Sequence, residues 1–167
     1  MKFAITGHQG LIGGHFKEAL ERQGHECALA VDLRETKEGK GFLRNIEDMP
    51  ARASEYKDAG IERVYAFAAP CTIRESRDPK HRARYTMDLI EGTERIVDFC
   101  KGAGIPEIFF ASSSRVLYPE LNPYVIGKIA AEKVLKEGIQ DGRIERFQIH
   151  RYSAVCGPGF DRTGRFG

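Results

Sequence analysis

The chain of 167 residues carries 26 lysines and arginines against 24 aspartates and glutamates, and 41% of its residues are hydrophobic. These values predict one soluble globular domain that buries a sizeable core. The net charge of +2 gives no basic footprint for nucleic acid or an anionic membrane, and no apolar run approaches the roughly 20 residues that span a bilayer.

Short apolar runs alternate with amphipathic stretches along the chain. The predicted strands are Lys2–Thr6, 27–31, 64–69, 107–112 and Arg146–Tyr152, and the predicted helices are 11–23, 87–101 and 124–136. This alternation predicts βαβ units, and therefore an α/β fold of the Rossmann type with a doubly wound parallel sheet and helices on both faces. The charged segment 34–41 and the glycine-rich segment 157–167 are predicted to be loops.

The cysteines give no sign of a disulfide framework or a metal site. Cys27, Cys71, Cys100 and Cys156 are widely spaced, and neither they nor the five histidines show the spacing of metal ligands. The first residues are too short an apolar stretch for a signal peptide. We therefore expect no metal, reduced thiols and a cytoplasmic protein.

A glycine motif follows the first predicted strand directly. Gly7, Gly10 and Gly13 form GxxGxxG at a strand-to-helix turn. The first glycine permits a tight turn, the second lets a pyrophosphate approach the backbone, and the third lets the helix pack closely. The helix N-terminus offers free N–H groups to the phosphates. The expected cofactor contacts are Gly7, Gln9, Gly10, Leu11, Ile12 and Gly13, whereas His8 is expected to be a solvated loop histidine.

An acidic residue ends the second predicted strand, 19 residues after Gly13. A carboxylate at Asp32 accepts hydrogen bonds from both hydroxyls of an adenosine ribose and repels a 2′-phosphate. This favours NAD over NADP, although Arg34 would partly reverse the preference. The alternative is a glycine-rich turn followed by an unrelated surface aspartate.

A second motif combines a phenol, an ammonium and a serine cluster. Tyr124 and Lys128 lie one turn apart on one face of a predicted helix, and the ammonium favours the phenolate. The pair can therefore take a proton from a sugar hydroxyl while hydride leaves the same carbon. Ser112, Ser113 and Ser114 end a predicted strand, at the edge where open α/β sheets bind ligands.

Several further segments complete a family pattern. They are Asn45-Ile46-Glu47-Asp48, Ala66-Phe67-Ala68-Ala69-Pro70, Gly92-Thr93, residues 110–116, Pro123 through Lys128 with Ala130-Ala131-Glu132, and residues 151–159. With the glycine loop they make the chain resemble the extended short-chain dehydrogenase/reductase family, in its branch of NAD-dependent nucleotide-sugar epimerases and dehydratases.

The resemblance implies a role for each matching residue. It implies that Tyr124 is the general base and also contacts the cofactor, that Lys128 lowers the pKa of Tyr124 and holds the nicotinamide ribose, and that Ser113 or Ser114 binds the reacting oxygen. The other cofactor contacts that it implies are Asn45, which reaches the adenine amine, Ile46, and Phe67, Ala68 and Ala69 along the nicotinamide half. It further implies a nucleotide-sugar substrate, and a homodimer through the helices that begin at Met87 and Tyr124.

The chain departs from the family pattern at four places. Tyr124 follows Ser114 by only ten positions, about half the family spacing, so the loop that helps to shape the sugar pocket is short. Gly127 stands where the family often has serine, and Leu89 where asparagine is common. Ser153-Ala154 replaces the family's Phe-Asn, whose asparagine contacts the substrate's diphosphate.

Two rival functions therefore stay open: an NADPH-dependent reductase of the same fold, and a non-catalytic NAD(P)-binding module. The 167 residues hold an NAD(P)-binding Rossmann domain and the Ser/Tyr/Lys set, but not the usual substrate lobe. Either the chain is a fragment of a longer enzyme, or a partner completes the substrate pocket, or the chain binds NAD without processing a sugar. We expect the fragment, because the sequence stops in a glycine-rich loop.

Overall fold

A single six-stranded sheet organises the chain, in the order β3-β2-β1-β4-β5-β6, and every neighbouring pair is parallel. The computed structural model describes residues 1–35, 41–70, 76–118, 120 and 122–157. The strands are β1 (Lys2–Thr6), β2 (Glu26–Val31), β3 (Phe42–Leu43), β4 (Ile61–Ala66), β5 (Glu107–Ser113) and β6 (Arg146–Tyr152).

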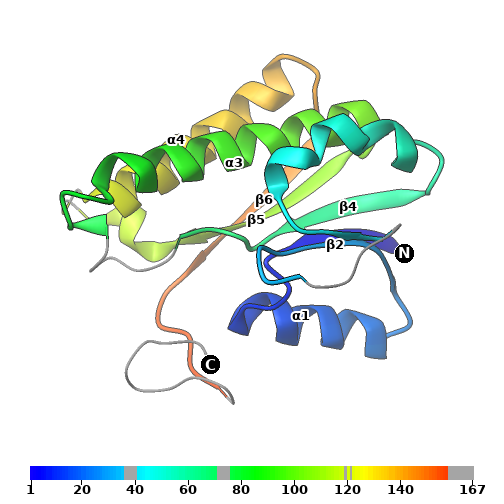
Figure 1. Ribbon diagram of the computed structural model, residues 1–167, viewed down its shortest axis with the longest axis horizontal. Coiled ribbons are helices and arrows are strands. Elements are labelled where there is room, and N and C mark those ends of the chain that lie inside the picture. The colour runs from blue at the N-terminus through cyan, green and yellow to red at the C-terminus, as the bar shows by residue number, and fades with distance from the viewer. Residues whose placement is uncertain (36–40, 71–75, 119, 121, 158–167) are drawn as a thin grey trace.

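Helices cover both faces of this sheet (Figure 1). On one face lies α1 (Leu11–Arg22), and on the other α3 (Arg82–Ala103) and α4 (Pro123–Gln140) lie side by side. Three short 3₁₀ helices complete the described elements: η1 (Ile46–Asp48), η2 (Pro50–Tyr56) and η3 (Ser114–Leu117). The doubly wound parallel architecture predicted from the alternation is thus confirmed.

Successive side chains of β1 point to opposite faces of the sheet and pack into two separate hydrophobic cores. Ala4 joins the larger core beneath α3 and α4, together with Val64 and Ile108, whereas Phe3 and Ile5 point to the face of α1. On that second face the ring of Phe16 lies 4.9–5.4 Å from three other aromatic rings, those of Tyr65, Phe67 and Phe109. Strands buried on both faces explain why the apolar runs in the sequence are nearly continuous.

The predicted boundaries are confirmed for Lys2–Thr6 and Arg146–Tyr152 and wrong for the strand at 64–69. The structure starts β4 at Ile61 and ends it at Ala66. The start was missed because Glu62 and Arg63 interrupt the apolar run, although Arg63 forms a 2.7 Å ion pair with Glu107 of the neighbouring strand. After Ala66 the chain leaves the sheet and passes beside the glycine loop.

Other elements are longer than predicted or were missed. The predicted helices 87–101 and 124–136 are the middles of α3 and α4, and α1 and β5 each differ by one residue at the C-terminal end. The two-residue strand β3 and the 3₁₀ helices η1 and η2 show no periodicity in the sequence. Of the predicted loops, residues 36–40 and 158–167 lie outside the described residues.

The α3–α4 interface brings two departures from the family pattern into contact. A Cβ atom added to Gly127 would lie 2.5 Å from Cδ1 and 3.0 Å from Cβ of Leu89, which is 3% exposed. Leu89 therefore fills the space that a side chain at position 127 would need. The two departures are one packing solution rather than two independent changes.

Replacing Gly127 by serine is expected to destabilise the fold by about 1–3 kcal/mol, because the new side chain overpacks against Leu89. Adding Leu89→Ala should relieve the clash, so that the double variant is more stable than the sum of the single effects by about 1 kcal/mol. Urea denaturation measures all three. Gly92→Ser in α3 is the control, because a Cβ there meets no atom within 4 Å; full additivity of Gly127→Ser and Leu89→Ala would contradict the packing argument.

No helix within the described residues has both the length and the apolar character that crossing a membrane requires.

Candidate active site

The glycine loop between β1 and α1 has no room for a side chain at Gly7 or Gly13. Gly7 adopts φ +76°, and a Cβ on it would lie 2.6 Å from the backbone nitrogen of Ala68. A Cβ on Gly13 would lie 2.2 Å from the carbonyl oxygen of Gly7. Gly10 caps α1 without a side-chain hydrogen bond. The loop thus leaves the first N–H groups of α1 uncovered by any capping side chain, as a phosphate site needs.

The loop lies where the strand order reverses, between β1 and β4. Phe67 donates its N–H to the carbonyl oxygen of Thr6 at 3.1 Å, and Ala68 donates to Thr6 Oγ1 at 3.2 Å. These bonds hold Phe67 and Ala68, followed by Ala69, beside Gly7. Open α/β sheets bind ligands in the crevice at such a switch point.

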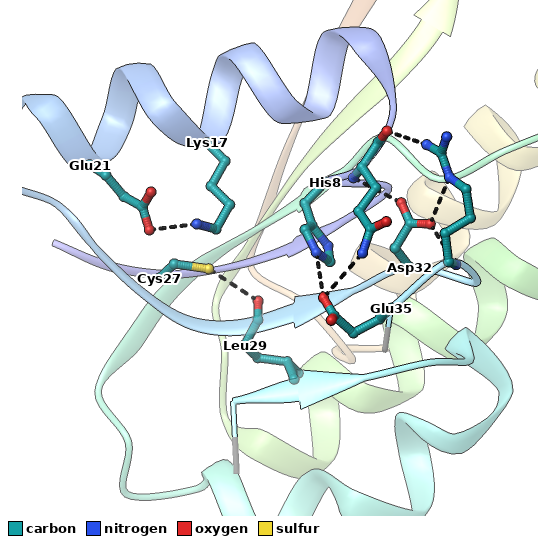
Figure 2. Close-up of polar contacts among 9 residues, drawn as sticks. His8, Lys17, Glu21, Cys27, Leu29, Asp32 and Glu35 are labelled. Carbon is teal, nitrogen blue, oxygen red and sulfur yellow. Dashed lines mark hydrogen bonds and ion pairs between the residues drawn. The ribbon is translucent and has the colours of Figure 1, made fainter. Parts of the chain in front are cut away.

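Asp32 follows β2 and holds the loop from the other side (Figure 2). Its side chain is almost fully buried. Oδ2 accepts the N–H of Gln9 at 2.9 Å, and Oδ1 accepts the N–H of Arg34 at 3.0 Å. The guanidinium of Arg34 donates to the carbonyl oxygen of Gln9, and its Nε lies 3.6 Å from Asp32 Oδ1. A carboxylate accepts about four hydrogen bonds, so Asp32 keeps capacity for a ligand hydroxyl.

The expectation of a solvated histidine in this loop is wrong. The side chain of His8 is only 10% exposed, and its Nε2 lies 2.8 Å from Oε2 of Glu35, which is itself buried (Figure 2). Gln9 Nε2 donates to the same oxygen at 3.4 Å. Glu35 thus holds His8 inside the fold and connects the glycine loop to the segment after β2. Nδ1 of His8 is buried with no hydrogen-bond partner among the described residues.

Asn45 and Ile46 follow β3 at the same edge of the sheet. The N–H of Asp32 donates to the carbonyl oxygen of Leu43 at 3.1 Å, which places this segment beside the end of β2. Asn45 caps η1: its Oδ1 accepts the N–H of Glu47 at 3.2 Å, and its Nδ2 donates to the carboxylate of Glu47 at 3.1 Å. Its side-chain oxygen is therefore already used once within the chain.

The serine cluster ends β5. Ser112 and Ser113 are buried in the strand, and Ser114 starts η3 half-buried. Ser113 Oγ accepts the N–H of Arg115 at 3.2 Å, which leaves the hydroxyl hydrogen of Ser113 able to donate to another group. Ser113 at the end of β5 and Ser114 directly after it both lie at the carboxyl edge of the sheet, next to β4.

Tyr124 and Lys128 lie in the first two turns of α4. Asn122 caps the helix by accepting the N–H of Val125 at 3.0 Å. Tyr124 is half-buried, whereas Lys128 is 4% exposed. The Lys128 ammonium donates to the carbonyl oxygen of Ala111 at 2.7 Å and lies 4.8 Å from the centre of the Phe110 ring. The end of β5 therefore anchors Lys128 next to the serine cluster.

A buried carboxylate, Glu132 of the family pattern, lies one turn after Lys128 on α4, and the sequence predicts no role for it. Glu132 accepts the hydroxyl of Ser112 at 2.6 Å and two hydrogen bonds from Arg151 of β6 at 2.9 and 2.7 Å. Burial alone would raise the pKa of Glu132, but the bonds from Arg151 and Ser112 outweigh it and hold the pKa below its usual value. Glu132 is therefore a carboxylate at neutral pH.

Two of the described cysteines, Cys27 and Cys100, lie apart from this chemistry. Cys27, Cys100 and Cys156 are free thiols, and Cys71 lies outside the described residues. Burial raises the pKa of Cys27 to about 11 against a smaller lowering by Lys17, and burial also raises the pKa of Cys100. Both are unreactive at neutral pH. Figure 2 shows Cys27 donating to the carbonyl of Leu29, away from His8 and Asp32. The described residues contain no cluster of three metal-ligating side chains.

The model that describes the NAD-dependent epimerase/dehydratase family matches residues 3–166 of this chain. The chain is also similar to a UDP-glucose 4-epimerase from Klebsiella pneumoniae, with 31% identity over 144 residues that cover 75% of this chain and 99% of that protein.

Two solved structures share the fold. The UDP-glucose 4-epimerase of Thermotoga maritima, solved with UDP-glucose, has a TM-score of 0.80 at 23% identity, over 100% of this chain and 60% of that one. MoeE5, solved with UDP-glucose and NAD, has a TM-score of 0.78 at 25% identity, over 98% of this chain and 57% of that one. This chain thus spans somewhat more than half the length of each.

Proposed function

We propose, from the premise that this chain belongs to the NAD-dependent epimerase/dehydratase family, that it binds NAD and provides the acid–base residues for transient oxidation of a nucleotide-sugar carbon. The observation that supports this most directly is the glycine loop at the switch point of the sheet, where side chains at Gly7 and Gly13 would strike backbone atoms. Such a loop keeps backbone N–H groups open to a diphosphate.

The residues around the loop fit NAD. Gly7, Gly10 and Gly13 would hold the diphosphate together with the N-terminus of α1. The Asp32 carboxylate, already oriented by the N–H groups of Gln9 and Arg34, would accept the ribose hydroxyls. The remaining expected contacts would come from Leu11 and Ile12 at the start of α1, Asn45 and Ile46 after β3, and Phe67, Ala68 and Ala69 after β4. NAD, when bound, would supply the acceptor for a hydride.

The acid–base step is assigned to the side chains of α4 that lie beside the end of β5 and to the serines that end this strand. Tyr124 would remove a proton from the sugar hydroxyl, and Lys128 would favour the phenolate through its positive charge and hold the nicotinamide ribose. Ser113 or Ser114 would donate a hydrogen bond to the reacting oxygen. The low exposure of Lys128 supports this assignment, because a charge acts more strongly at short range in a desolvated site.

The proposed substrate class is a nucleotide-sugar, in accord with the UDP-glucose named for the relatives. Residues 1–167 would form one cofactor-binding domain of such an enzyme. Epimerisation or dehydration would follow the oxidation. A homodimer through α3 and α4 is also proposed, supported by the partly exposed Met87, Ile126 and Ile129 on those helices.

Replacing Asp32 by asparagine is expected to weaken NAD binding at least about tenfold, because the ribose loses a charged acceptor. The same change should reduce the preference for NAD over NADP, since it removes the repulsion of a 2′-phosphate and frees the guanidinium of Arg34. Isothermal titration with NAD and NADP measures both effects.

Asp58→Asn, at an exposed acid in the turn before β4, is the matched control and should leave both affinities unchanged. Unaltered NAD affinity in Asp32→Asn would place the ribose elsewhere. Absence of NAD binding in the unmodified chain would refute the proposed function itself.

A further inference from the structure

The carboxylate of Glu132 joins three elements at the carboxyl edge of the sheet. Glu132 lies on α4 and is 6% exposed. It holds Ser112 of β5 through one hydrogen bond and Arg151 of β6 through two. Ser112 and Arg151 lie opposite each other on the paired strands β5 and β6, so one side chain of α4 binds both residues of this pair.

Lys128 makes a second contact of the same kind. It lies one turn before Glu132, on the same face of α4. Its ammonium donates to the carbonyl oxygen of Ala111, so that Lys128 and Glu132 contact consecutive residues of β5. Two contacts at successive helical turns determine where α4 lies along the strand, since a slip of the helix would break both.

The strand and the helix each continue directly into the proposed acid–base group. Ser113 follows Ser112 on β5, and Tyr124 lies one turn before Lys128 on α4. We propose that Glu132 is a positioning residue that sets the register of α4 against β5 and β6, and so aligns Tyr124 and Lys128 with Ser113. The roles of these three residues rest on the proposed function.

The chemistry of the contact favours positioning over simple stabilisation. The side chain of Arg151 is 40% exposed, whereas that of Glu132 is 8% exposed. Water screens such a half-exposed ion pair, so it contributes little net stability. A carboxylate held by a fork of Arg151 donors and by one hydroxyl is nevertheless fixed in direction. Its effect is therefore expected in the placement of α4 more than in the stability of the whole fold.

The test measures how accessible Lys128 is in the full chain, by acetic anhydride labelling and peptide mass spectrometry. In the unmodified protein Lys128 is buried and should react slowly. In E132Q the amide cannot accept both donors of Arg151, α4 loses its register, and the labelling rate of Lys128 should rise about tenfold. Alkylation of Cys100, fully buried in α3, is followed in parallel and should not change, because it reports unfolding of the whole core.

Glu94→Gln is the matched control. It removes another carboxylate that accepts from an arginine, at 2.7 Å between Arg143 and α3, while Arg143 keeps Asp98 and Asp141. Labelling of Lys128 and of Cys100 should both stay at the unmodified rates in this variant. A selective rise of Lys128 labelling in E94Q would show that any lost ion pair loosens α4, and would overturn the proposal.

Two further outcomes are decisive. Unchanged Lys128 labelling in folded E132Q overturns the proposal. If the labelling of Lys128 and the alkylation of Cys100 rise together, E132Q is unfolded and S112A replaces it. S112A keeps the ion pair and removes only the hydrogen bond from β5. A selective rise of Lys128 labelling of about threefold in S112A then supports the proposal, and no rise overturns it. NAD titration of the unmodified chain tests the proposed function separately, so its failure is distinguishable from a failure of the register argument.

Discussion

Replacing Tyr124 by phenylalanine is expected to lower turnover of a nucleotide-sugar about a thousandfold, because the reaction would lose its proposed general base. NAD affinity should stay within about twofold, since the glycine loop and Asp32 are untouched and the ring is kept. The measurements are conversion of UDP-glucose followed by chromatography, and NAD titration followed by fluorescence. Accumulation of reduced nicotinamide in the unmodified chain would indicate a net dehydrogenase, and consumption of added NADPH would indicate a reductase, whereas an epimerase shows neither.

Tyr118→Phe provides the control for this experiment. Tyr118 follows η3 at the same edge of the sheet, but its ring is 58% exposed and lies outside α4. It should retain full turnover. Equal activity of Tyr124→Phe and the unmodified chain would reject the general-base role, and loss of NAD binding in Tyr124→Phe would show that the phenol acts mainly in holding the cofactor.

The strands that the sequence predicts best are those with an uninterrupted local pattern. Lys2–Thr6 has the boundaries of β1 because a run of apolar residues ends at a glycine, and both signals are local. The start of β4 was not predictable in this way. Arg63 is tolerated in that strand because Glu107 of β5 pairs with it, and Glu107 is 44 positions away in the sequence.

The features of the candidate site also divide into those with a local sequence signal and those that depend on long-range contacts. Glycine spacing and the Tyr-x-x-x-Lys pair are local signals, and the structure places both motifs at the carboxyl edge of the sheet. The contact between Glu132 and Arg151 depends on the register of β5 against β6, which no short window of sequence contains. The burial of His8 depends likewise on Glu35, which the sequence places in a charged loop and the structure places inside.

Departures from a family pattern were informative once their neighbours were known. Read separately, Gly127 and Leu89 look like two losses of polar side chains. In the structure the leucine occupies the volume next to the glycine, so the helix that bears Tyr124 and Lys128 packs on α3 through an apolar contact. The sequence contains both substitutions but does not indicate that the two side chains are neighbours, because contact between α3 and α4 is a property of the fold.

Replacing Gly13 by alanine is expected to weaken NAD binding by at least about a hundredfold and to destabilise the fold by about 3 kcal/mol. The new Cβ would lie 2.2 Å from the carbonyl oxygen and 2.8 Å from the carbonyl carbon of Gly7, and backbone atoms cannot move aside as a flexible side chain can. The first turn of α1, whose N–H groups are proposed to bind the diphosphate, would have to move away from Gly7. NAD titration and urea denaturation of the same protein preparation measure the two effects.

The sign of the stability change distinguishes Gly13 from an ordinary helical glycine. Alanine is the better helix former by about 1 kcal/mol, so a glycine without neighbours should gain stability on replacement. Gly92 in α3 is such a position, with no atom within 4 Å of an added Cβ, and Gly92→Ala should be stabilising with unchanged NAD affinity. If Gly13→Ala behaved like Gly92→Ala, then α1 would not need to approach Gly7 closely, and the diphosphate would have to bind elsewhere than at this turn.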